Sequence, residues 1–250
     1  MNFIGIIPAR FASSRLPGKP LADIGGKPMI QWVYENASTE LKDIIVATDH
    51  LDIKQAVLGF GGRAMMTSPD HPSGTDRCAE VNQVLADSGE SYDVIINIQG
   101  DEPFIKKSHI WLLRDAFSDP ATQIATLANP INDSAELKNP NAVKVVVGKH
   151  GNALYFSRSP IPHNRNIADD NWLSSHTYLK HLGMYAYRSE ILQQITMLES
   201  SPLEKTESLE QLRWLENGFG IKVLVTHEPS HGIDTPEDLE TARKKAEKTL

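Results

Sequence analysis

The sequence predicts an α/β fold, a three-layer sandwich in which a mostly parallel sheet has helices on both faces. Two observations support this prediction. Short apolar runs alternate with amphipathic segments from Phe3 to Val147, and this alternation is typical of βαβ units. The first run, Phe3 to Ile7, is almost continuously apolar, as expected of a strand that is buried on both faces.

Composition limits the class of protein further. The chain has 250 residues, of which 40% are apolar, and it can bury a sizeable core. We expect a single domain over residues 1–250, with an insertion-like region at about 154–187. The net charge of −7 gives no indication of a nucleic-acid partner. Cys78 is the only cysteine, which excludes an internal disulfide and a cysteine zinc cluster.

The N-terminus lacks the charged and apolar regions of a signal peptide, and no apolar run is long enough to cross a membrane. We therefore expect a cytoplasmic protein with no membrane partner.

The elements of the first 147 residues follow from their periodicity and from their Gly and Pro residues. Strands are expected at 3–7, 44–48, 63–67, 94–98, 124–127 and 142–147. Helices are expected from Pro28, after His50, from Ser73 and from Ser108.

The pattern changes in the second half of the chain. Two strand-like stretches, 154–158 and 178–187, flank a polar stretch, and together they predict a small strand-rich insertion that serves as a lid or a dimer contact. A capping box at Ser208–Gln211 predicts the start of a helix. After a last strand at 221–225, Thr235 is expected to cap the C-terminal helix.

The loop after the first apolar run carries three cations, Arg10, Arg15 and Lys19, and two hydroxyls, Ser13 and Ser14. In open parallel sheets, ligands bind beyond the carboxyl ends of the strands. Backbone N–H groups and cationic side chains at that position suit a polyphosphate.

Two carboxylates are candidate metal ligands. Asp101 follows the strand at 94–98, in a turn that contains Gly100. Asp234 precedes the expected cap residue Thr235, where its side chain either supports the helix start or points into the cleft. If the two carboxylates converge, they suit Mg²⁺, which takes one or two carboxylates together with phosphate oxygens.

Two further sets of polar residues are candidate ligand contacts. Ser73 to Arg77 places hydroxyls and N–H donors at a helix start, which suits an anion or the polar edge of a base. A set in the second half suits a polyhydroxylated acid, although its members also fit core or surface roles: Arg158, His181, Tyr185, Glu210 and Gln211.

The stretch His227–His231 matches the zinc motif H-E-x-x-H. Zinc binding by this motif requires a helix that presents both histidines on one face. Pro229 and Gly232 predict a loop instead, so we set the zinc interpretation aside.

The same segments resemble a known family. Residues 7–21 resemble the N-terminal signature of the sugar cytidylyltransferases, and further segments in order along nearly the whole chain are similar to the 3-deoxy-manno-octulosonate (Kdo) cytidylyltransferases among them. These segments are 46–49, 73–77, 99–103, 139–144, 154–158, 181–185, 209–213 and 232–238. Phe11 stands where the family pattern has Tyr.

The resemblance implies the nucleotide-diphospho-sugar-transferase fold, a homodimer, and dependence on Mg²⁺. It also implies roles for particular residues. Those expected to hold the CTP phosphates or to surround the cytidine are Ala9, Arg10, Ser13, Lys19, Ala47, Asp49, Ser73 and Arg77. Those expected to line the sugar-acid pocket are Gln99, Arg158, His181, Tyr185, Glu210 and Gln211. Asp101 and Asp234 would hold the metal, and these two with Arg10 and Lys19 would be catalytic.

The implied reaction is transfer of CMP from CTP to the anomeric hydroxyl of Kdo, with release of pyrophosphate, which activates Kdo for lipopolysaccharide biosynthesis. The same chemistry on 8-amino-Kdo or another sugar acid is an alternative. A nucleotide-sugar sensor without catalytic activity is a second alternative, although it would not need both Asp101 and Asp234.

Overall fold

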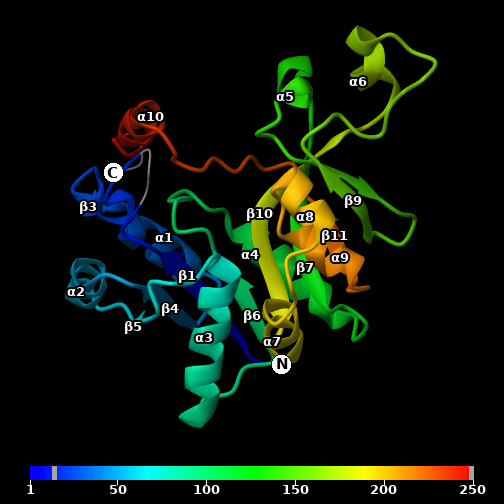
Figure 1. Ribbon diagram of the computed structural model, residues 1–250. Helices are drawn as coiled ribbons and strands as arrows, with labels where there is room; N and C mark the ends of the chain where they lie inside the picture. Colours follow the sequence, from blue (N-terminus) through cyan, green and yellow to red (C-terminus); the bar gives the residue numbers. More distant parts are fainter. Residues whose placement is uncertain (13–15, 248–250) are drawn as a thin grey trace. The chain divides into compact units, whose positions relative to one another are not determined.

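The structure is a computed structural model that describes residues 1–12 and 16–247. The chain divides into two compact units, and Figure 1 labels their elements. The first unit comprises Met1–Trp111 and Ser230–Leu250, and the second comprises Leu112–Pro229. This division rests on compactness, and the expected single domain with an insertion stays a prediction.

The first unit is built on four parallel strands in the order β6-β1-β4-β5. Their bounds are β1 Phe3–Ala9, β4 Asp43–Thr48, β5 Ala64–Met66 and β6 Val94–Asn97. A short antiparallel pair, β2 (Asp23–Ile24) and β3 (Lys27–Pro28), lies between β1 and α1 in the chain. These strands confirm the four parallel strands expected from the first apolar runs.

Helices follow the strands of this unit in alternation. They are the 3₁₀ turn η1 (Lys19–Leu21) and the α-helices α1 Met29–Ser38, α2 Leu51–Gly59, α3 Gly74–Asp87, α4 Lys107–Asp115 and α10 Pro236–Ala246. Ser73 caps α3, because its hydroxyl accepts hydrogen bonds from the N–H groups of Thr75 and Asp76. The α4 helix crosses the boundary between the two units, since its last four residues belong to the second.

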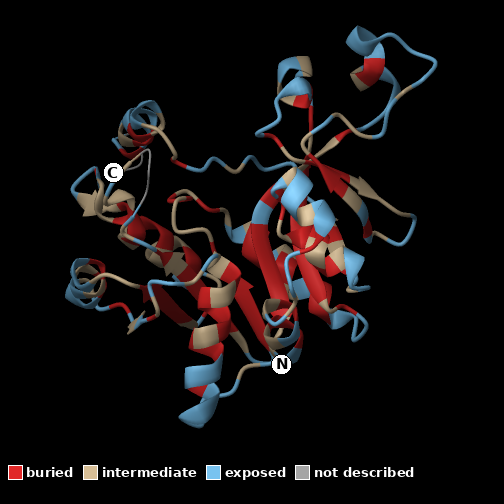
Figure 2. Ribbon diagram, in the orientation of Figure 1, coloured by how far each residue is buried: buried red, intermediate tan, exposed pale blue. Residues whose placement is uncertain are grey.

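The core of the first unit lies along its central strands, which are red in Figure 2. A second apolar cluster packs α10 against α1 and the β2–β3 pair. Its buried members are Ile24, Met29, Trp32, Ile233, Leu239, Ala242 and Ala246. Burial of these apolar side chains stabilises the position of α10.

The second unit contains five strands with mixed pairing. They are β7 Ile124–Pro130, β8 Lys144–Val147, β9 Ala153–Ser157, β10 Leu179–Arg188 and β11 Ile221–Val225. Strand β11 pairs with β7 in parallel, whereas the β7–β10, β10–β8 and β8–β9 pairs are antiparallel. The predicted strands at 154–158 and 178–187 correspond to β9 and β10.

Seven helical segments complete this unit: η2 Ala116–Ser118, α5 Ser134–Lys138, η3 Asp169–Asn171, α6 Trp172–Ser175, α7 Ser189–Thr196, α8 Pro202–Glu207 and α9 Gln211–Glu216. The polar excursion between β9 and β10 contains η3 and α6. Trp172 anchors it, since this side chain is buried in a cluster with Ile131, Leu137 and Tyr178.

The predicted helix starts were partly wrong. The capping box expected at Ser208–Gln211 does not form, because Ser208 has a φ of 53° and ends α8 in the left-handed conformation. The capping boxes of the structure lie at Ser201–Glu204 and Thr235–Asp238. The second of these confirms Thr235 as the cap of the C-terminal helix.

The H-E-x-x-H stretch, residues 227–231, contains no helix, as expected from its proline. Within residues 1–12 and 16–247, no helix combines the length and the apolar character that crossing a membrane requires.

Candidate functional site

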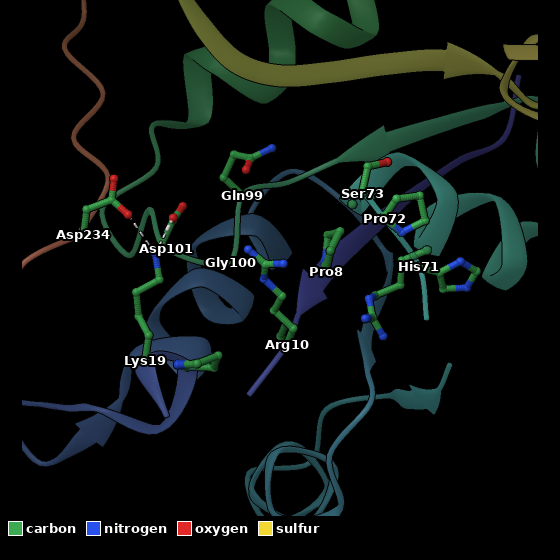
Figure 3. A pocket seen from close by; sticks show the side chains of 14 residues that line it. Pro8, Arg10, Lys19, His71, Pro72, Ser73, Gln99, Gly100, Asp101 and Asp234 are labelled. Carbon is green, nitrogen blue, oxygen red and sulfur yellow. Dashed lines mark hydrogen bonds and ion pairs between the residues drawn. The ribbon is translucent and has the colours of Figure 1, made fainter. Parts of the chain in front are cut away.

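The candidate site of the first unit lies at the carboxyl edge of its parallel strands. Arg10 follows β1, Asp49 follows β4, and Asp101 follows β6. A pocket of about 330 Å³ opens at this edge, and Figure 3 shows the side chains around it. The sheet therefore brings together loops that are far apart in the sequence, as expected for ligand sites in this class of fold.

Lys19 lies between two carboxylates in this pocket. Its Nζ is 2.6 Å from Oδ2 of Asp101 and 3.2 Å from Oδ1 of Asp234. Figure 3 shows both carboxylates directed at the Lys19 ammonium group. The side chain of Lys19 is 15% exposed, whereas the two carboxylates are more open to solvent. Asp101 and Asp234 thus converge on the Lys19 ammonium. Convergence of these two carboxylates was the condition under which they suit a metal ion.

Asp234 is brought to the pocket by its neighbours on both sides. The N–H of Ile233 donates to the backbone oxygen of Asp101 over 2.9 Å, and the Ile233 side chain is buried. On the other side, the N–H of Asp234 donates to Oδ2 of Asp238, which belongs to the capping box of α10. The start of α10 therefore fixes the position of the carboxylate.

Gly100 allows the chain to turn toward Asp101. A Cβ atom at residue 100 would lie 2.7 Å from the backbone oxygen of Pro8, which is closer than real Cβ contacts. The close approach of the two loops therefore requires glycine at this position.

The Asp101–Asp234 pair fits a magnesium ion. Both groups offer hard oxygen ligands that already share one cation, the Lys19 ammonium. Among the described residues, no cluster of three His, Cys, Asp or Glu side chains suits a metal. Two carboxylates without further protein ligands match Mg²⁺, which fills its remaining positions with water and substrate phosphates.

A second cation of the pocket, Arg10, is an exposed residue. In Figure 3 it lies between the Lys19 group and Ser73. Ala9 and Gln99 also line the pocket. The predicted phosphate contact Ser13 lies outside the described residues.

The predicted cytidine contacts surround a buried arginine. Arg77 is 3% exposed, and its guanidinium donates to Oδ2 of Asp49 over 3.1 Å and to Oγ1 of Thr67. Ser73 uses its hydroxyl to cap α3 and donates to Asp76, while Ala47 is buried in β4. Arg77, Asp49 and Ser73 are thus ordered in advance of any ligand, and their role in binding cytidine stays a prediction.

Two pocket residues were missed by sequence reasoning. His71 and Pro72 line the pocket just before the cap residue Ser73. The ring of His71 is 2.5 Å from a carboxylate oxygen of Glu80, which also accepts the N–H of Ser68. Burial acts to raise the pKa of Glu80, but these hydrogen bonds outweigh it, so the pKa is lowered. The sequence signal that could have identified His71 is its position two residues before Ser73, where the Ser73–Arg77 stretch begins.

The residues predicted to line the sugar-acid pocket belong to the second unit, with the exception of Gln99. His181 lies half-buried in β10, where desolvation lowers its pKa to about 3. Its Nε2 is 3.0 Å from Oγ1 of Thr126, whose single hydroxyl proton is used on the backbone oxygen of Met184 at 2.7 Å. The neutral His181 ring therefore donates from Nε2.

Tyr185 lies beside His181, with 5.2 Å between the ring centroids. Burial, and then the nearby Glu210 carboxylate, raise the pKa of Tyr185 well above its ordinary value. Gln211 is buried at the start of α9. The structure therefore brings His181, Tyr185 and Glu210 together.

Arg158 has a different environment within the second unit. Three of its guanidinium N–H groups donate to the backbone oxygens of Glu207, Ser208 and Pro140. Two of the five donors remain for other partners. Arg158 holds the end of α8, and its predicted contact with a sugar carboxylate stays a prediction.

The fold and the pocket define the class of the protein. The family model for cytidylyltransferases matches residues 4–226. A putative glucose-1-phosphate thymidylyltransferase from Bacillus anthracis has a TM-score of 0.66 at 18% identity, covering 98% of this chain and 95% of its own, and this likeness concerns the fold alone. The expected α/β nucleotide-sugar transferase fold is therefore confirmed.

Similar proteins define the family more narrowly. The 3-deoxy-manno-octulosonate cytidylyltransferases of Phocaeicola vulgatus and Parabacteroides distasonis are 57% and 56% identical to this chain; the matches cover 97% of it in both cases, and 96% and 97% of those proteins. A solved CMP:2-keto-3-deoxy-manno-octonic acid synthetase in complex with CTP matches with a TM-score of 0.92 at 46% identity over 100% of both chains. This chain belongs to the family of 3-deoxy-manno-octulosonate cytidylyltransferases.

Proposed function

We propose that this protein transfers CMP from CTP to the anomeric hydroxyl of Kdo and releases pyrophosphate, which activates Kdo for lipopolysaccharide biosynthesis. Membership of the family supports the substrate pair. The observation that carries the chemistry is the convergence of Asp101 and Asp234 on Lys19, with Arg10 in the same pocket. Such a site matches a nucleoside triphosphate and a divalent cation.

The Kdo hydroxyl itself serves as the nucleophile. Cys78 is fully buried, and the Ser73 hydroxyl is engaged by its own helix, so neither is available for a covalent intermediate. The new bond forms between the Kdo oxygen and the α-phosphorus, and the bond from the α-phosphorus to the bridging oxygen breaks. The proton of the attacking hydroxyl passes to solvent. Catalysis then rests on alignment of the reactants and on charge neutralisation.

Arg10 and Lys19 bind the triphosphate and stabilise the pyrophosphate as it leaves. Mg²⁺ held by Asp101 and Asp234 would neutralise charge at the α-phosphate and lower the pKa of the attacking hydroxyl. Because Lys19 lies between these two carboxylates, the ammonium has to shift when a divalent cation binds there. The phosphates then give the ammonium a new anionic partner.

Gln99 and the set in the second unit are proposed to bind Kdo. The neutral ring of His181 and the protonated hydroxyl of Tyr185 suit hydroxyl groups of a sugar, because each offers hydrogen bonds without a charge. Arg158 would use its two remaining donors on the Kdo carboxylate.

The direct test is pyrophosphate release from CTP and Mg²⁺ with Kdo, 8-amino-Kdo and N-acetylneuraminate supplied in parallel. We expect release with Kdo. Release with 8-amino-Kdo alone would keep the chemistry and replace the substrate. No release with any of the three acids, from a folded protein that binds CTP, would support a nucleotide-sugar sensor.

Two further proposals follow from the family. We propose that the protein is a homodimer, which light scattering coupled to size-exclusion chromatography tests directly. We also propose that it acts in the cytoplasm, where CTP is available as a substrate.

A further inference from the structure

Phe11 lies at the base of the loop that carries the two phosphate-binding cations. Arg10 precedes it directly. The backbone oxygen of Phe11 accepts the N–H of Gly18 over 3.2 Å, and Lys19 follows Gly18. The hydrogen bond between Phe11 and Gly18 therefore closes the loop at a point where each partner is next to one of the cations.

The Phe11 ring has contacts on two sides. It stacks on the ring of His50, with centroids 4.0 Å apart and an interplanar angle of 16°. It also lies against Gly18, since a Cβ there would be 3.5 Å from two ring carbons. Gly18, which lies against the ring, has a φ of 68°, and this left-handed backbone conformation favours glycine.

The partner of the stack, His50, is itself fixed. Its N–H donates to Oγ1 of Thr48 over 3.2 Å. Its Nδ1 accepts the N–H of Asp52 over 3.3 Å, so His50 caps α2. The His50 backbone is therefore tied to the end of β4, and the His50 ring is tied to the start of α2.

The backbone of Phe11 is tied to the same region. Its N–H donates to Oδ1 of Asp49 over 3.2 Å, and Oδ2 of Asp49 accepts from the buried Arg77. The loop is thus joined to β4 through both the backbone and the ring of one residue.

We propose that the stack of Phe11 on His50 positions Arg10 and Lys19 for the triphosphate. Neither aromatic residue touches the substrate in this scheme; both are positioning residues. This inference rests on the proposed function, because it assumes that the two cations bind the phosphates of CTP. Stacking adds to the energy of area burial, so its loss should free the loop without unfolding the sheet.

The first test is Phe11→Ala with Phe11→Tyr as the conservative variant. We expect F11A to weaken binding of CTP and of pyrophosphate by about tenfold in calorimetry, because the cations lose their alignment. Binding of cytidine should change by less than about twofold, since this ligand has no phosphate. F11Y keeps the stack and should restore binding of CTP to that of the wild type.

Two His50 variants separate stacking from helix capping. His50→Asn keeps an N-cap acceptor but removes the ring, and His50→Phe keeps the ring but removes the acceptor. We expect H50N to weaken CTP binding as F11A does, and H50F to retain it. The reverse order would assign the role to the cap of α2 and overturn the inference.

Phe60→Ala is the matched control. Phe60 forms a tilted pair with Tyr34 in the same unit, with centroids 5.5 Å apart, and it does not line the pocket. We expect F60A to bind CTP like the wild type. Equal losses in F60A and F11A, or no loss in F11A, would overturn the inference. If the wild type binds neither CTP nor pyrophosphate, the proposed function has failed instead.

Discussion

In the first unit the candidate site consists of charged side chains on loops, whereas in the second unit it centres on uncharged rings inside a strand. Lys19, Asp101 and Asp234 keep 15%, 29% and 48% of their side-chain surface exposed. Tyr185 is buried in β10, and His181 is half-buried in the same strand. The charged side chains of the first unit can change ion partners when a ligand binds. The rings of the second unit present hydrogen-bonding groups in fixed positions.

The difference teaches where charge can be placed at low cost. The carboxylates of Asp101 and Asp234 lie on loops, where they reach both solvent and the Lys19 ammonium. A histidine inside a strand loses its solvation, and its pKa falls to about 3. The ion pairs of the first unit therefore lie on partly exposed loops, and the rings of His181 and Tyr185 in the second unit are uncharged.

The largest effect is expected from Asp101→Asn. Loss of this carboxylate removes a proposed metal ligand and half of the converging pair, so the rate of pyrophosphate release should fall by about a hundredfold to a thousandfold. The melting temperature should change little, because partly exposed ion pairs add little stability. Asp87→Asn, at the far end of α3, is the control. A loss below about tenfold would contradict the assigned role.

Lys19→Met should separate activity from metal binding. Activity should fall by at least about tenfold, because the triphosphate loses a cation. In the absence of nucleotide, Mn²⁺ should bind about tenfold more tightly by electron paramagnetic resonance, since the ammonium no longer competes for the two carboxylates.

Lys27→Met is the matched control for this prediction, because Lys27 pairs with Glu35 at 2.7 Å outside the pocket. Unchanged Mn²⁺ affinity in K19M would show that the ammonium and the metal do not share a position.

The desolvated ring of His181 predicts a pH dependence of stability. The unfolded chain takes up a proton near pH 6.5, while the folded protein does so only near its pKa of about 3. The contribution to stability is therefore complete above pH 6.5 and is lost as the pH falls toward 3. Between pH 6.5 and 5 the loss amounts to about 2 kcal/mol.

Urea unfolding of the wild type and of His181→Asn at pH 7 and pH 5 measures this loss. The variant should lack this part of the pH dependence, whatever its stability at pH 7. The same dependence in both proteins would show that His181 is not buried in its neutral form.

The smallest effect is expected from Arg158→Lys. The variant lacks the guanidinium group that donates to three backbone oxygens, those of Glu207, Ser208 and Pro140. The free energy of unfolding should therefore fall by about 1 kcal/mol. The KM for CTP should stay unchanged, whereas the KM for Kdo should rise if the remaining donors bind the carboxylate. An unchanged KM for Kdo would assign Arg158 to structure alone.

The phosphate end of the site was predictable from the residues because its charged side chains directly follow apolar strands. Parallel strands bring their carboxyl ends to one edge, so Arg10 and Asp101 had to be neighbours. The contact of Lys19 with its second partner, Asp234, was not predictable from the residues. The position of Asp234 depends on the burial of Ile233 and on the start of α10.

Other features depended on tertiary contacts. Ser208 matches a cap pattern, but the preceding helix α8 ends there in a left-handed conformation. His181 and Tyr185 also fit core roles in the sequence, so the pattern of residues alone did not decide between a ligand contact and a core position. The stack of Phe11 on His50 joins two loops and leaves no periodic signal.

The measurement that tests the central claim most directly is ³¹P nuclear magnetic resonance of the protein with CTP, Mg²⁺ and Kdo. The account predicts that CMP-Kdo and pyrophosphate form in equal amounts, and that neither forms with Asp101→Asn on the same timescale. Formation of CDP and inorganic phosphate, or equal product from the wild type and the variant, would contradict it.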